Sequence, residues 1–85
     1  MSALQVEVFP IEPARWIAVI DAPAGSFSTE AAAPELVADE VARTIADVLG
    51  AGTAHRLVDE DGREWTADVA REQLRRLQGG ATSPR

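Results

Sequence analysis

The residue best suited to chemistry in this chain is its single histidine, His55. An imidazole can serve as a general base or a metal ligand, but a site of several histidines needs more than one. Ser26 follows Gly25 without the second glycine of a Gly-x-Ser-x-Gly elbow, so no serine is marked as a nucleophile. The chain has no cysteine, which excludes a thiol nucleophile and cysteine zinc ligands. The residues therefore predict no catalytic group.

A carboxylate-rich segment around Gly62 is the second candidate for chemistry. Its acids are Asp59, Glu60, Asp61, Glu64 and Asp68. With Gly62 at the sixth position of a calcium-binding loop, the first position falls on Leu57, where a carboxylate ligand is required. Asp61-Gly62 instead fits the centre of a two-residue hairpin turn, where acidic side chains are solvated. We therefore expect no metal site and no bound cofactor.

The charge balance argues against nucleic acid as a partner. Fourteen acidic residues outweigh eight basic ones, for a net charge of −6. Phosphate binding needs clustered cations. The segment Gly50-Ala51-Gly52 follows a predicted helix and lacks the lysine of a phosphate-binding loop. Arginines near the chain's end, at residues 71, 75 and 76, suit the closing turns of a helix, whose dipole favours cations. We expect no nucleic-acid partner.

The acidic excess lies in the first fifty residues. They carry eight acids against Arg15 and Arg43, whereas residues 51–85 carry six charges of each sign. Such asymmetry has two interpretations: it steers association with a basic protein, or it only keeps a solvated surface soluble. Phe9 falls on the polar register of its strand, so an exposed Phe9 would mark a partner patch on the outer face of the sheet. The predicted partner contacts are Phe9, Glu35, Asp39, Glu40 and Asp47.

The spacing of apolar residues predicts five strands and two helices. We expect strands at residues 4–9, 15–20, 26–29 and 55–58, a fifth strand returning through residue 65, and helices at residues 34–49 and 66–78. The second strand is apolar at nearly every position, which is typical of a strand covered on both faces. Pro34 suits a first helical position, and Thr66 can cap the last helix. The fold class is α+β, with a two-layer β-β-β-α-β-β-α order, an antiparallel sheet and both helices on one face.

Length and composition indicate one domain. Its 85 residues suffice for a small core at residues 1–78, followed by a disordered tail at residues 79–85. A charged fraction of 26% and a mean hydropathy of −0.08 are too polar for a membrane span. The first residues lack the basic and apolar regions of a signal peptide, so we expect a cytoplasmic location. Trp16 and Trp65 are expected to anchor the core, with Phe9 and Phe27 packed beside them; an exposed Phe9 is the alternative.

From Trp16 onward, an apolar strand leads into a turn with proline and glycine, a short polar strand and an acidic amphipathic helix. The residues that carry this pattern are Trp16, Ala18, Pro23, Gly25, Ser28, Glu30, Glu35 and Val41. In these features, residues 1–50 resemble the HicB-like antitoxin domain. The resemblance implies a three-stranded meander crossed by a helix, a non-enzymatic role, and binding to a small basic ribonuclease toxin.

These observations favour a small non-enzymatic protein-interaction module with a basic protein partner. Two alternatives stay open. The first is a small enzyme or ligand-binding subunit that uses His55 with nearby carboxylates. The second is a structural homodimer that shields an exposed sheet edge, because unpaired edge strands invite pairing.

Overall fold

The computed structural model describes residues 3–82, which form an α+β fold of four strands and two helices. The elements are β1 (Leu4–Glu12), β2 (Arg15–Ala22), β3 (Gly25–Ala31), a short 3-10 helix η1 (Pro34–Leu36), α1 (Val37–Leu49), β4 (His55–Val58) and α2 (Ala67–Thr82). The first four strands and both helices match the sequence-based prediction in order, but Pro34 begins the 3-10 helix η1 and the α-helix starts at Val37. Pro10 does not end β1, which continues through a register shift between Pro10 and Glu12.

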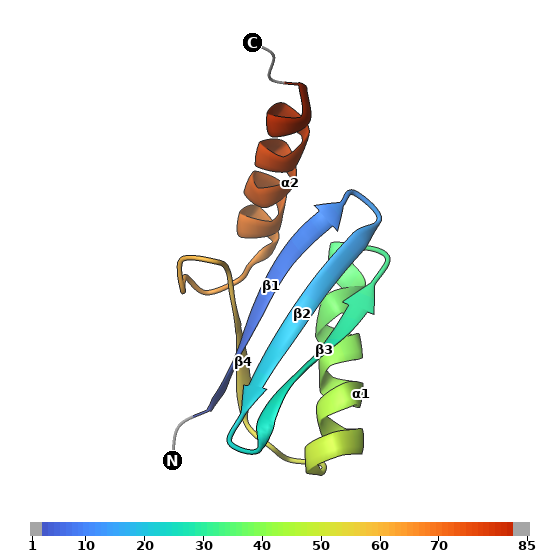
Figure 1. Cartoon of the computed structure of the whole chain (residues 1–85), viewed down its shortest axis with the longest axis vertical. Helices are drawn as coiled ribbons and strands as arrows, with labels where there is room; N and C mark the ends of the chain where they lie inside the picture. Colours follow the sequence, from blue (N-terminus) through green and yellow to red (C-terminus); the bar gives the residue numbers. More distant parts are fainter. Residues whose placement is uncertain (1–2, 83–85) are drawn as a thin grey trace.

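The sheet is mixed, with the strand order β3-β2-β1-β4. The meander β1-β2-β3 is antiparallel, but β4 pairs with β1 in parallel, with Leu4 opposite His55. The prediction of a purely antiparallel sheet is therefore wrong at this pair. The reason is the path of the chain: β3 runs in the direction of β1, α1 carries the chain back, and β4 must then run the same way as β1 (Figure 1).

The predicted fifth strand does not form. After β4 the chain turns, the Asp59 N–H donates to the Arg63 carbonyl at 2.9 Å, and an isolated bridge joins Val58 to Glu64. A two-residue hairpin turn centred on Asp61-Gly62 would have placed Asp59 opposite Glu64. The observed pairing of Val58 with Glu64 is shifted from that register by one residue. The shift separates two like charges, and Gly62 accommodates the turn with a positive φ of 85°.

The core lies between α1 and one face of the sheet. From the sheet it takes Val6, Val8, Trp16, Ala18 and Ile20, and from the helices Val37, Val41, Ile45 and Ala70. Trp16 is 1% exposed, and Trp65 packs edge-on against it with ring centroids 6.1 Å apart. The prediction that both tryptophans anchor the core is confirmed for Trp16, whereas Trp65 is half-buried at the border of the core.

The two helices cover the sheet unequally. Helix α1 lies along β3 and β2, whereas α2 contacts β1 and η1 and then projects beyond the sheet (Figure 1). We predicted a second layer in which both helices pack along the sheet. Helix α1 does so, whereas α2 packs on the sheet over only part of its length. The last helix reaches Thr82, so it overlaps the tail predicted from residue 79, and residues 83–85 lie outside the described residues.

The core assignment predicts different costs for one substitution at two sites on α1. Val41 is fully buried, whereas Val48 is 58% exposed. Val41→Ala should lower the free energy of unfolding by about 1.5–3 kcal/mol, since buried methyl groups are lost and a cavity remains. Val48→Ala should change it by about 0.5 kcal/mol or less. Urea unfolding measures both, and equal losses would contradict the assignment.

Candidate functional site

The side of the sheet opposite the core, here called the open face, carries apolar side chains that no helix within residues 3–82 covers. Side chains alternate along strands, so Phe9, Ile17 and Val19 point away from the face that holds Val8 and Ala18. Phe9 lies opposite Ile17 in the β1-β2 register, and Val19 follows on β2. All three are half-buried. We call Phe9, Ile17 and Val19 the apolar strip.

Acidic residues surround this strip. The open face carries Glu7 and Glu12 from β1, Asp21 from β2 and Glu30 from β3, against Arg15 and Arg56. Arg15 is held by Glu30, with Nε 3.0 Å from Oε2, and by Glu12, with Nη1 3.6 Å from Oε2. The hydrogen bond from Arg15 lowers the pKa of Glu30. The four acids outnumber the two arginines, so acidic charge dominates the field of the open face.

The five predicted partner contacts fall in two separate places. Phe9 lies on the open face, whereas Glu35 belongs to η1 and Asp39, Glu40 and Asp47 belong to α1, in the other layer. Glu40 is paired with Arg43 at 2.6 Å. The structure therefore does not bring Phe9 together with the four acids.

Sequence reasoning missed Ile17 and Val19 as surface residues. The run from Arg15 to Ile20 predicted a strand covered on both faces, but β2 is covered only on the face of Trp16 and Ile20. No periodicity could have separated the two sets, because residues on both faces are apolar. The sequence did offer one indication of an apolar open face, which was Phe9. It is an apolar residue on the polar register of β1, and in the structure it lies beside Ile17.

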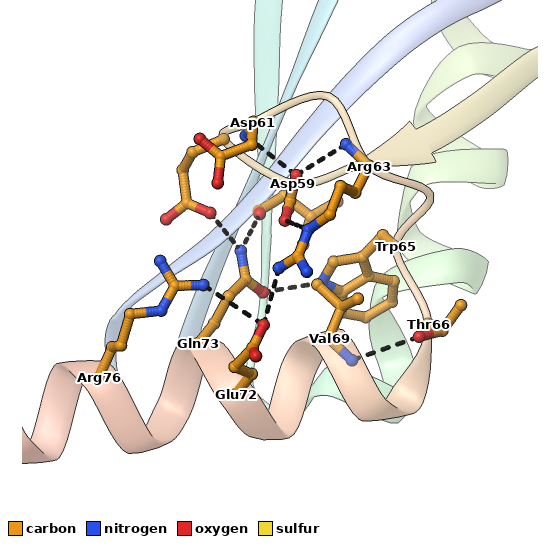
Figure 2. A network of polar contacts seen from close by, with 11 residues as sticks. Asp59, Asp61, Arg63, Trp65, Thr66, Val69, Glu72, Gln73 and Arg76 are labelled. Atoms are coloured by element: carbon orange, nitrogen blue, oxygen red, sulfur yellow. Dashed lines mark hydrogen bonds and ion pairs between the residues drawn. The ribbon is translucent and has the colours of Figure 1, made fainter.

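A polar network around Asp59 positions α2 (Figure 2). Asp59 is 1% exposed, which overturns the expectation that this acid is solvated. Its Oδ1 accepts the N–H groups of Asp61 and Arg63 at 2.9 Å each, and its Oδ2 accepts Arg63 Nε at 2.9 Å. Burial by itself would raise the pKa of Asp59, but the hydrogen bonds from Arg63 and Asp61 outweigh it, so the pKa is lowered.

The same network reaches from the turn to the sheet through Gln73. Its Nε2 donates to the Val8 carbonyl at 2.8 Å and to Glu60 Oε1 at 2.7 Å, while its Oε1 accepts the indole N–H of Trp65 at 2.9 Å. Arg63 also pairs with Glu72 of α2 at 2.7 Å, and this contact lowers the pKa of Glu72. With these partners in place, the carboxylate of Asp59 is buried, accepts three hydrogen bonds and serves the structure of the turn.

His55 stands apart from this network. It is half-buried at the start of β4, and its Nδ1 lies 3.4 Å from the Thr53 carbonyl oxygen. Asp59 follows the other end of that strand, about 13 Å away at the rise of an extended chain. His55 and Glu64 both line a shallow hollow of about 490 Å³. Among residues 3–82, no group of three or more histidines and acids is placed to hold a metal ion.

A more enclosed hollow of about 370 Å³ lies between α2 and the start of α1. It is lined by Trp16, Pro34, Glu35, Ala38, Trp65, Ala67, Ala70, Arg71 and Leu74. Both indole N–H groups are used inside the protein, Trp16 by the Pro13 carbonyl at 3.1 Å and Trp65 by Gln73. The tryptophans therefore offer this groove only carbon surface, and its charged lining residues are Glu35 and Arg71.

Comparison with known proteins gives no relative. No family model, no curated protein and no solved structure matches the chain. Within the described residues, neither helix is long and apolar enough to cross a membrane.

The network predicts that Asp59 is essential for stability while its neighbour is not. Asp59→Asn should lower the free energy of unfolding at pH 7 by about 1.5–3 kcal/mol, because charge-assisted hydrogen bonds at a buried site are lost. Asp61→Asn is the matched control, since Asp61 is exposed and joins the network through its backbone N–H. Equal stability of the two variants in urea would contradict the role given to Asp59.

The lowered pKa of Asp59 predicts how its contribution depends on pH. An aspartate in the unfolded chain has a pKa of about 3.9, so the stabilisation is fully present above that pH and is lost as the pH falls through the lower folded pKa. The stability gap between wild type and Asp59→Asn should narrow below about pH 4. Urea unfolding as a function of pH measures it, and a gap that widens in acid would show the wrong sign.

Proposed function

We propose that this protein is a non-enzymatic protein-interaction module that binds a basic protein through its open face. The observation that carries the proposal is the uncovered apolar strip of Phe9, Ile17 and Val19 with acidic side chains around it. Apolar side chains left together on a surface mark interaction sites, and an acidic surround favours a cationic partner.

The open face is better suited to bind a basic protein than the acidic surface of α1 is. On α1, Asp39 and Asp47 are exposed, but Arg43 lies between them and the buried valines face inward. Binding energy in protein interfaces comes mainly from desolvated apolar and aromatic anchors, with charges setting orientation and association rate. The open face offers both, since Phe9 supplies an aromatic anchor.

The partner is a protein because the chemistry of the face disfavours the other classes. Its acidic excess repels phosphate backbones. The groups that suggested catalysis are otherwise engaged or isolated: Asp59 is buried and accepts three hydrogen bonds from Arg63 and Asp61, and His55 has a backbone carbonyl as its neighbour. These observations support a binding role over the alternative of an enzyme.

The resemblance of residues 1–50 to the HicB-like antitoxin domain supports the same class of partner. It implies a three-stranded meander crossed by a helix, and β1-β2-β3 with α1 across β3 and β2 has this arrangement. By this resemblance, the basic partner is a small ribonuclease toxin, which the protein would hold in an inactive complex.

Affinity capture with the full chain, from a lysate of the organism that carries the gene, tests the proposal. We expect a basic protein that is retained at low salt, because complementary charge contributes to binding. Phe9→Ser should reduce its retention about tenfold, as expected for losing a buried aromatic anchor, and Asp47→Lys on α1 should not.

The two variants also decide which surface is used. Loss of the partner with Asp47→Lys but not with Phe9→Ser would move the site to α1. Capture of acidic proteins alone, or of none that depends on Phe9, would overturn the proposal.

A further inference from the structure

We propose that the element of the partner that covers the open face is a basic amphipathic α-helix. This inference rests on the proposed function and adds the form of the partner. It follows from the dimensions of the apolar strip, the placement of polar residues on the outer strands and the charge of the face.

The apolar strip has the width of one helix. It occupies the two central strands, with Phe9 on β1 and Ile17 and Val19 on β2, and neighbouring strands lie about 4.8 Å apart. Two strands with their side chains therefore present a band about 10 Å wide, which matches the diameter of a helix. Residues two apart on a strand are separated by about 7 Å, so the strip is covered by about two helical turns of 5.4 Å each.

The outer strands explain why a second sheet does not fit. On the open face, β3 presents Ser26, Ser28 and Glu30, whereas β4 presents Arg56 and, opposite Glu7, the buried Val58. A sheet packed face to face would lay apolar side chains over all four strands and bury these polar groups without partners. A strand added beside β3 would extend the sheet but leave Phe9 uncovered. A helix covers the two central strands and leaves the polar rim in water.

Charge decides between a separate partner and a second copy. A second copy would bring the same acidic excess against Glu7 and Asp21, and like charges across an interface oppose association. The chain's own basic helix, α2, is already used: Ala70 and Leu74 pack in the core, and Arg71 and Arg76 pair with acids of the same helix. The complementary element is thus a helix with an apolar stripe flanked by lysine or arginine, from another protein.

The inference is tested with a defined peptide and the isotope-labelled full chain. The probe is a lysine–leucine peptide whose leucines follow the spacing i, i+3, i+4 and i+7. Its controls are a shuffled peptide of the same composition and a glutamate–leucine peptide of the same pattern. We expect amide shifts centred on Phe9, Ile17 and Val19, and a gain of helical circular dichroism that neither control gives.

Matched variants separate the face from non-specific charge. Phe9→Ser should weaken binding of the probe about tenfold or more, and Val19→Thr, which keeps the β-branched shape, should weaken it several-fold. Glu7→Lys on the open face should weaken it by about 2–5-fold, whereas Asp47→Lys, with the same change of charge on α1, should leave it within about twofold.

Three outcomes would overturn the inference. They are binding of the shuffled peptide as tightly as the patterned one, amide shifts centred on α1, or sedimentation showing a dimer that the peptide cannot dissociate. A captured basic protein that requires Phe9 but protects the backbone amides of β3 would overturn the helix and leave the proposed function standing. A probe that binds the strip as a helix, with no basic protein captured from the lysate, would overturn the proposed function alone.

Discussion

The protein has apolar side chains on both faces of its second strand but helices that cover only one. In a chain of 85 residues, the core between α1 and the sheet takes Val6, Trp16 and Ile20 on one side, and no described element is left for Ile17 and Val19 on the other. Small domains bury a smaller share of their surface than large ones, so such a remainder is expected. Phe9 of the neighbouring strand β1 lies beside Ile17 and makes this uncovered apolar surface specific.

The buried carboxylate of Asp59 determines where the second helix goes. By accepting three hydrogen bonds it closes the turn after β4, and through Arg63 and Gln73 the same turn is joined to α2 and to the Val8 carbonyl. Helix α2 is thereby held at the end of β1 on the core side. The position of one carboxylate thus contributes to keeping α2, like α1, off the open face in the described part of the chain.

The sequence predicted the meander, α1 and β4 because each is set by local periodicity and by breakers such as Pro34 and the glycines after α1. It did not predict the parallel pairing of β4, since strand direction depends on how α1 packs across the sheet. It also took Asp59 for a solvated turn residue, because a carboxylate followed by Asp61-Gly62 looks the same in sequence whether or not α2 covers it. Of the residues predicted to contact a partner, Phe9 lies on the open face. Glu35 and Asp47 lie in the other layer.

By itself, the sequence determined the composition of this protein: no cysteine, one histidine and an acidic excess in the first fifty residues. Those properties depend on residue types alone. Only the tertiary structure decided which face of the sheet stays uncovered and that Phe9, Ile17 and Val19 meet on it. The physical reason is that alternation assigns side chains to two faces, whereas the packing of α1 and α2 decides which of the two becomes the core.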